Sequence, residues 1–287
     1  MKKLLTNLAL ISLLGDSMAC QKSSDTGRPS TLPAQTIIDV SYGTNQAQKM
    51  DVYLPAGRTD STTKVMVMIH GGAWMEGDKR DFNPYAEILK RELPDYAIVN
   101  INYRLATQTG NWFPTQEEDV KKAVQAVYDK RGEYKVSDEF VLLGASAGAH
   151  LALLQGYKYN TPVKPKAIVS FFGPTDLAAM YSAQTDAFYK YALSTLIGGT
   201  PATAPEKFAQ SSPITFVNAQ SPPTLLLHGK NDPLVPVEQA ELLRTKLAAA
   251  GVSHELVVYP EEGHGWTDAN LTASFNSITS FLNKHMQ

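Results

Sequence analysis

Short apolar runs alternate with segments of helical periodicity along most of this chain, and this alternation constrains the fold more than any other feature of the sequence. Six runs are continuously apolar, as expected of parallel strands that are covered on both faces. They occupy residues 65–69, 97–101, 140–143, 167–171, 224–227 and 256–259. Two earlier runs, 37–41 and 50–54, alternate between apolar and polar residues and predict an antiparallel hairpin at the edge of the sheet.

Helical periodicity lies between these runs, at residues 82–93, 116–130, 147–158, 237–250 and 270–285. The alternation predicts an α/β protein with a mostly parallel, eight-stranded sheet and helices on both faces. A chain of 287 residues with 43% apolar residues is long enough to bury the core of one such domain.

A serine lies at the junction between one predicted strand and the helix that follows it. Residues 144–148 read Gly-Ala-Ser-Ala-Gly, and the small residues Gly144 and Gly148 allow a turn sharp enough to lift the Ser146 hydroxyl out of the sheet. The same pattern also occurs in ordinary strand–helix turns. Ser146 is therefore a candidate nucleophile whose assignment depends on the other loops.

Three other loops follow the ends of predicted strands. The strand at 65–69 runs into His-Gly-Gly-Ala-Trp at 70–74, where a glycine pair lets backbone N–H groups turn towards a developing oxyanion. Asp232 follows the strand at 224–227, and His264 follows the strand at 256–259. Because the carboxyl ends of parallel strands lie along one edge of a sheet, we expect these loops to meet the Ser146 turn there.

These motifs together resemble the α/β-hydrolases, close to the hormone-sensitive-lipase-like enzymes and related carboxylesterases. The resemblance runs from Gln35 to the C-terminus, and the order serine, acid, histidine is the one expected of that fold. It rests on His-Gly-Gly at 70–72, Asn-Tyr-Arg-Leu at 102–105, Phe113-Pro114 with Asp119, the Ser146 turn, His-Gly-Lys-Asn-Asp-Pro-Leu-Val-Pro at 228–236 and Glu-Gly-His-Gly-Trp at 262–266. The chain departs from the family at Ala73, where those relatives typically carry a third glycine, which leaves the subfamily and the substrate open.

The resemblance implies a catalytic triad. His264 accepts the proton from Ser146 as it attacks an ester carbonyl, and Asp232 holds the imidazole in the correct tautomer. The product of the attack is an acyl-enzyme that water then hydrolyses. Asp176 also follows a predicted strand and is a rival acid, but the loop and spacing of Asp232 match the family's acid position.

The resemblance also assigns the oxyanion hole to the backbone N–H groups of Gly72, Ala73 and Ala147. Trp74 and Trp266 each adjoin a catalytic loop, so either they line a substrate pocket or they only pack.

Four polar residues near these loops have supporting roles in this interpretation. His70 is expected to brace its own loop, and His150 to pack in the helix after the serine turn. Arg104 and Asp119 are expected to buttress the active-site loops.

Residues 175–213 interrupt the regular alternation, because no strand is predicted there. Tyr181, Phe188, Tyr189 and Tyr191 have the spacing of a helix. Either this insertion covers the active-site edge as a lid, or its aromatic side chains only pack it onto the domain.

The N-terminus differs in character from the rest of the chain. Residues 1–3 are a short basic start, and residues 4–14 are apolar over a length suited to a signal peptide but too short to span a bilayer. Cys20 is the single cysteine and follows Ala19, which resembles a bacterial lipobox in which the thiol carries lipid. The alternative is an ordinary signal peptide that is cleaved nearby.

We therefore expect an exported protein of the bacterial cell envelope, anchored by lipid at Cys20 on the periplasmic or surface side, or else secreted. The expected division is a signal peptide at 1–20, a flexible tether at 21–35 and an α/β-hydrolase domain at 36–287.

The composition of the chain limits which ligands and partners we expect it to bind. A net charge of −2 gives no long-range attraction to nucleic acid, and the six histidines are scattered, so neither a metal site nor a cofactor is expected. The expected substrate is a small-molecule or glycan ester, and the sequence leaves the oligomeric state open. Two other functions remain: an amidase or peptidase that resembles kynurenine formamidase or prolyl oligopeptidase, and a hydrolase fold that only binds.

Overall fold

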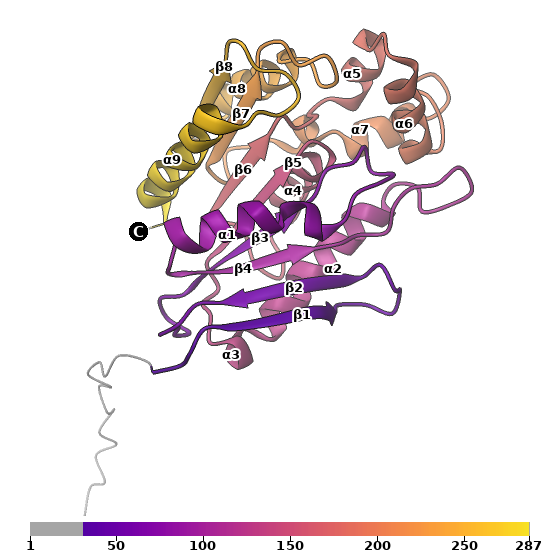
Figure 1. Cartoon of the computed structure of the whole chain (residues 1–287). Coiled ribbons are helices and arrows are strands. Elements are labelled where there is room, and N and C mark those ends of the chain that lie inside the picture. Colours follow the sequence, from indigo (N-terminus) through magenta and orange to yellow (C-terminus); the bar gives the residue numbers. More distant parts are fainter. Residues whose placement is uncertain (1–30, 287) are drawn as a thin grey trace, which may run out of the picture.

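One eight-stranded sheet runs through the computed structural model, which describes residues 31–286 (Figure 1). The strand order is β1-β2-β4-β3-β5-β6-β7-β8; β1 and β4 pair antiparallel with β2, and all other neighbours are parallel. This confirms the predicted fold class. The strands are β1 (Gln35–Ser41), β2 (Lys49–Leu54), β3 (Lys64–Ile69), β4 (Tyr96–Ile101), β5 (Phe140–Ala145), β6 (Ala167–Phe171), β7 (Thr224–Gly229) and β8 (His254–Tyr259).

Helices cover both faces of the sheet because the side chains of each strand alternate between two cores. Val65, Val67 and Ile69 of β3 belong to the core beneath α2 (Thr115–Asp129), α4 (Ala147–Lys158) and α8 (Glu238–Ala249). Met66 and Met68 belong to the opposite core, beneath α1 (Asn83–Glu92) and α9 (Asp268–His285). In Figure 1, α1 lies in front of the sheet and α2 and α4 lie behind it. These five helices occupy the segments in which helical periodicity is predicted.

The insertion at 175–213 differs from the prediction of a single helix. It forms α5 (Leu177–Ala183), α6 (Ala187–Ile197) and α7 (Pro205–Ser211), so Tyr181 lies on a different helix from the other aromatic residues. The break follows from local chemistry, because Gln184 is extended and the Asp186 carboxylate caps α6 by accepting the Phe188 N–H at 2.7 Å. The short helices α3 (Arg131–Tyr134), η1 (Lys79–Phe82) and η2 (Pro213–Phe216) complete the described chain.

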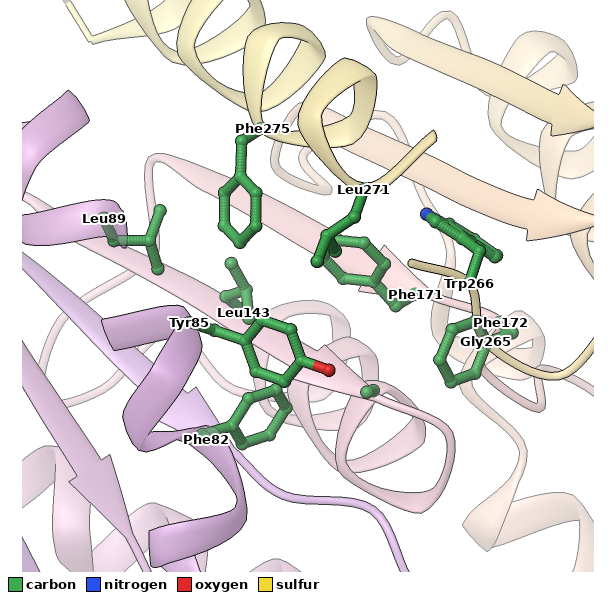
Figure 2. A pocket seen from close by; sticks show the side chains of 11 residues that line it. Phe82, Tyr85, Leu89, Leu143, Phe171, Phe172, Gly265, Trp266, Leu271 and Phe275 are labelled. Carbon is green, nitrogen blue, oxygen red and sulfur yellow. The ribbon is translucent and has the colours of Figure 1, made fainter. Parts of the chain in front are cut away.

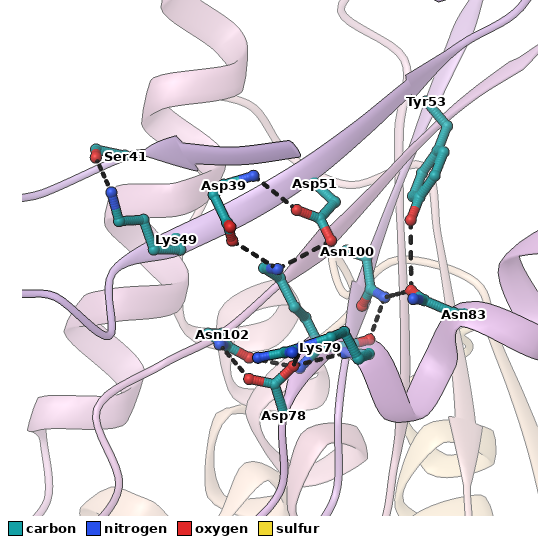
Figure 3. A network of polar contacts seen from close by, with 11 residues as sticks. Asp39, Ser41, Lys49, Asp51, Tyr53, Asp78, Lys79, Asn83, Asn100 and Asn102 are labelled. Atoms are coloured by element: carbon teal, nitrogen blue, oxygen red, sulfur yellow. Dashed lines mark hydrogen bonds and ion pairs between the residues drawn. The ribbon is translucent and has the colours of Figure 1, made fainter. Parts of the chain in front are cut away.

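A buried polar network joins η1 to the β1–β2 edge of the sheet (Figure 3). The Lys79 ammonium lies 2.9 Å from carboxylate oxygens of both Asp39 and Asp51, and the Lys79 side chain is only 3% exposed. Burial alone lowers the pKa of Lys79, but the two carboxylates outweigh it and raise the pKa. Asp39 reaches this ammonium from a strained backbone with φ of 56°.

The N-terminal predictions fall largely outside the described residues. The segment predicted to be a signal peptide, Cys20 and most of the segment predicted to be a tether at 21–35 precede residue 31. Within residues 31–286, no helix combines the length and apolar character needed to cross a membrane.

Candidate active site

Ser146 lies on a sharp turn between β5 and α4. Its backbone has φ of 54° and ψ of −121°, a conformation that is rare for a residue with a side chain. Gly144 and Gly148 are required on either side: a Cβ on Gly144 would overlap the carbonyl of Gly148, and one on Gly148 would overlap the carbonyl of Ile69. The turn therefore stores backbone strain at the candidate nucleophile, as catalytic turns often do.

The structure brings together the three residues that the sequence predicts as a triad. The Nε2 atom of His264 lies 3.0 Å from the Ser146 hydroxyl, and its Nδ1 atom lies 2.7 Å from Oδ2 of Asp232. The Asp232 side chain is fully buried, whereas His264 is 17% exposed. With a proton on Nδ1 donated to Asp232, Nε2 is free to accept the hydroxyl proton.

Two backbone N–H groups and a neighbouring histidine ring hold Asp232. Its Oδ1 atom accepts the backbone N–H groups of Leu234 and Val235, at 2.8 and 2.9 Å. The buried His228 ring places Nε2 3.4 Å from Oδ2, while donating to the Val235 carbonyl at 2.8 Å. Burial alone raises the pKa of Asp232, but His228, His264 and the Val235 N–H lower it well below its usual range. The acid is thus ionised and fixed in one orientation.

Sequence reasoning missed His228. The signal was its position at the end of β7, four residues before Asp232.

The rival acid Asp176 has a different role. Its carboxylate caps α5 by accepting the N–H of Ala179 at 2.9 Å. Within residues 31–286 no group of three or more histidine, cysteine or acidic side chains is arranged to hold a metal.

The loop after β3 lies directly against the serine turn. A Cβ built on Gly71 would be 3.4 Å from Cβ of Ser146. Gly72, Ala73 and Trp74 have φ values of 101°, 48° and 62°, so three consecutive residues are left-handed. In the described part of the chain, the N–H groups of Gly72, Ala73 and Ala147 donate to no protein acceptor. Three free donors beside Ser146 fit the binding of an oxyanion.

The side chains of His70 and Tyr103 hold the loop after β3 in place through hydrogen bonds to its backbone. The His70 Nδ1 atom lies 2.7 Å from the Gly71 carbonyl, and the two rings stack with centroids 4.3 Å apart. The Tyr103 hydroxyl donates to the carbonyls of His70 and Gly71, at 3.0 and 3.2 Å. Farther along, the Arg104 guanidinium makes a close ion pair with the buried Asp119 carboxylate at 2.7 Å. These contacts agree with the supporting roles expected of His70, Arg104 and Asp119.

An apolar cavity of about 80 Å³ opens beside the triad, between α1 and α9 (Figure 2). Phe82, Tyr85 and Leu89 form one wall, and Leu271 and Phe275 form the other. The remaining lining residues are Leu143, Ala145, Phe171, Phe172, Gly265 and Trp266. Because Ala145 precedes Ser146 and Gly265 follows His264, an apolar group in this cavity would lie next to the triad.

Phe172 joins the cavity to the triad. Its ring packs on that of His264, with centroids 4.5 Å apart. Sequence reasoning did not single it out, although it directly follows β6 at the catalytic edge.

The two tryptophans that adjoin the catalytic loops, Trp74 and Trp266, differ in their position relative to the cavity. Trp266 lines the cavity, and its indole N–H donates to Ser274 of α9 at 2.8 Å. The prediction that Trp74 lines a pocket is wrong: Trp74 is 2% exposed, is absent from the cavity wall, and donates its indole N–H to His150 at 3.1 Å. Its left-handed backbone turns the side chain inwards, which the sequence does not reveal.

Comparisons with known proteins place this arrangement in a family. The model of the BD-FAE family matches residues 50–247, which is more than half of the chain. Among curated proteins of Mycobacterium tuberculosis, Esterase LipC is 29% identical over 85% of this chain and 64% of its own length. The probable carboxylic ester hydrolase LipM is 33% identical over 78% of this chain and 54% of its own. The chain thus spans between about half and two thirds of the length of these relatives.

A solved structure described as a truncated form of carbohydrate esterase from gut microbiota has the same fold. It superposes with a TM-score of 0.76 at 24% identity, over 90% of this chain and 98% of that one. The family match and this shared fold together confirm the predicted resemblance to the α/β-hydrolases. The chain belongs to the BD-FAE family of α/β-hydrolase proteins.

Proposed function

We propose that this protein is a serine carboxylesterase with Ser146 as its nucleophile. The observation that carries the proposal is the unbroken chain of hydrogen bonds from Ser146 through His264 to Asp232, at 3.0 and 2.7 Å. Free N–H groups in the loop that contacts the serine turn and directly after Ser146, together with the apolar cavity beside the triad, support it. The relatives LipC and LipM are named as an esterase and a probable carboxylic ester hydrolase.

In the first half of the reaction, Ser146 Oγ attacks the ester carbonyl carbon while its proton moves to His264 Nε2. The carbonyl electron pair moves onto the oxygen, which accepts hydrogen bonds from the N–H groups of Ala73 and Ala147. Asp232 stabilises the imidazolium that forms. Collapse of the tetrahedral intermediate breaks the bond to the alcohol oxygen, and that oxygen takes the proton from His264 as the alcohol leaves.

In the second half, water enters the position that the alcohol has vacated. His264 removes a proton from this water, whose oxygen attacks the acyl carbon on Ser146. The same N–H groups bind the second oxyanion. Cleavage of the acyl–Oγ bond returns the proton to Ser146 and releases the carboxylic acid.

Turnover of aryl esters from acetyl to dodecanoyl tests the proposal. We expect hydrolysis that favours short chains, because the cavity is small, and loss of turnover to background in Ser146→Ala. Ser182→Ala is the matched control, since it removes an exposed serine of the insertion. Matching anilides in the same panel test the amidase alternative, and turnover of the anilides alone would replace the esterase proposal.

We further propose that the alcohol part of the substrate is a sugar chain. The three exposed large aromatic side chains of residues 31–286, Trp112, Phe188 and Tyr191, support this because they lie on α6 and the loop beside it. Tyr191 accepts a hydrogen bond from Gln108 of that loop at 2.6 Å, and the Trp112 ring packs over Gly198 at the end of α6. Exposed aromatic patches mark binding surfaces.

The sugar proposal makes a separable prediction. Trp112→Ala and Tyr191→Ala should raise KM for acetylated xylan fragments and leave turnover of an aryl acetate unchanged. Leu242→Ala is the control, because it removes an exposed apolar side chain of α8. Equal KM values in all variants would contradict the proposal that the alcohol part is a sugar chain, whereas the esterase proposal would still stand.

We also propose that lipid on Cys20 anchors the protein to a bacterial envelope membrane after the signal peptide is cleaved. The short apolar segment and the Ala19-Cys20 junction support this. Cys20→Ser should release the protein from the membrane fraction with its activity intact. An unmodified N-terminus downstream of Cys20 in the native protein would instead mean plain secretion.

A further inference from the structure

His150 lies at the meeting point of three elements of the site. It is fully buried in α4, one helical turn after Ser146. Its Nδ1 atom lies 3.1 Å from the indole nitrogen of Trp74, and its Nε2 atom lies 2.6 Å from the carbonyl of Ser211. The nucleophile helix, the loop after β3 and α7 of the insertion thus share one imidazole ring.

The two hydrogen bonds select a single form of this ring. A carbonyl oxygen only accepts and an indole N–H only donates, so the proton is on Nε2 and the lone pair is on Nδ1. Burial lowers the pKa of His150 to about 4, which keeps the ring neutral near neutral pH. A protonated ring would present an N–H to the indole N–H, and the bond to Trp74 would be lost.

Trp74 is the residue whose position most needs such support. It ends the run of three left-handed residues that includes Ala73, whose N–H donates to no acceptor within residues 31–286. A strained backbone of this kind persists only when its surroundings fix it. The Trp74 carbonyl accepts the N–H of Ala106 at 2.8 Å, and the side chain is fixed by His150.

We infer that His150 is a positioning residue that holds the oxyanion loop in its strained conformation and couples it to the helical insertion through Ser211. It contacts no reacting atom. Its action is to keep the Ala73 N–H where the oxyanion forms, so the inference rests on the proposed esterase function. Through the same ring, displacement of α7 would loosen the oxyanion loop.

Two substitutions at one position separate this role from packing alone. His150→Phe removes both hydrogen bonds, whereas His150→Gln retains an acceptor for Trp74 and a donor for Ser211. We expect His150→Phe to lower kcat for an aryl acetate by about tenfold to a hundredfold with little change in KM, because oxyanion contacts strengthen in the transition state. His150→Gln should recover most of that loss.

A double-mutant cycle tests the connection to Trp74. Trp74→Phe keeps a six-membered aromatic ring but loses the indole N–H together with the five-membered ring, so it breaks the contact to His150 and should reproduce the effect of His150→Phe. The double variant should lose no more than either single variant, because both break the same contact. Additive losses would mean that the two residues act separately and would overturn the inference.

Tyr157→Phe is the matched control on the same helix. It removes a buried hydrogen bond to Thr224 of 2.8 Å at the far end of α4, and its kcat should equal that of the wild type. Wild-type kcat in His150→Phe or, if that variant does not fold, in Trp74→Phe would overturn the inference while leaving the esterase in place. A wild-type protein that hydrolyses no ester would overturn both.

Discussion

Two polar clusters of this molecule contain similar groups but differ in whether those groups are all paired. Each is centred on a buried carboxylate, Asp232 in the candidate site and Asp51 in the network at the sheet edge. Each also contains a residue with a strained, left-handed backbone, Ser146 in the first and Asp39 in the second. In the sheet-edge network the Lys79 ammonium is paired with the carboxylates of both Asp39 and Asp51, and the Lys79 side chain is almost excluded from solvent. This ammonium is therefore not available to a ligand.

The Ser146 cluster is open on one side. The His264 ring remains partly exposed, and the N–H groups of Ala73 and Ala147 donate to nothing within residues 31–286. Satisfied buried groups stabilise a fold, whereas strain and free donors at a surface are features of sites that bind. The comparison therefore assigns stability to the Lys79 network and chemistry to the Ser146 cluster, and substitutions in the two should have opposite effects.

The largest effect is expected for Asp232→Asn. The amide cannot stabilise the imidazolium and favours the wrong tautomer of His264, so kcat should fall by roughly ten thousandfold. The midpoint of thermal unfolding should change far less than kcat does. Asp176→Asn is the control, because asparagine also caps helices, and it should keep wild-type kcat. A large loss of kcat in Asp176→Asn with wild-type kcat in Asp232→Asn would show that Asp176 is the acid of the triad.

Lys79→Met should behave in the opposite way. It leaves the buried Asp51 carboxylate without its cation, and we expect a loss of unfolding free energy of about 3 kcal/mol. This is the low end for breaking a buried pair, because Asp39 is exposed to solvent. Turnover by the folded fraction should remain within a few-fold of the wild type. Large loss of kcat with unchanged stability would show that this network acts on the site.

Acidification should weaken the fold through His150. Well above pH 6.5 the ring is neutral in both states, so it gives the unfolding free energy no pH dependence there. As the pH falls from 6.5 towards 4, the unfolded chain binds a proton that the native ring does not, so unfolding free energy decreases by up to about 1.4 kcal/mol per pH unit. Denaturation at several pH values should give a flatter profile for His150→Gln. An unchanged profile would mean that other groups dominate the pH dependence.

The smallest effect is expected at the helix cap of α5. Asp176→Ala removes the acceptor for the Ala179 N–H and should cost about 1 kcal/mol of unfolding free energy. It should leave kcat unchanged. A change in kcat would show that the start of the insertion is coupled to the triad through more than the fold.

The sequence predicts the parts of this architecture that depend on local pattern. Continuous apolar runs locate the six strands from β3 to β8, and alternating runs locate β1 and β2. The ends of the strands locate Ser146, Asp232 and His264, because parallel strands share an edge. The contacts that hold the site in its conformation join residues that are far apart in the sequence, and local pattern does not predict them. His150 meets a carbonyl 61 residues away in Ser211, and no periodicity reports such a pairing. The inward turn of Trp74 depends on backbone angles that its neighbours in sequence do not reveal.

The reaction of the full-length protein with a fluorophosphonate tests the central claim most directly. Such probes phosphonylate a serine only when a neighbouring base activates it. Intact mass and peptide mapping should show one adduct, on Ser146, and no adduct in Ser146→Ala. An adduct on any other residue, or labelling that persists in Ser146→Ala, would contradict the assignment of the nucleophile.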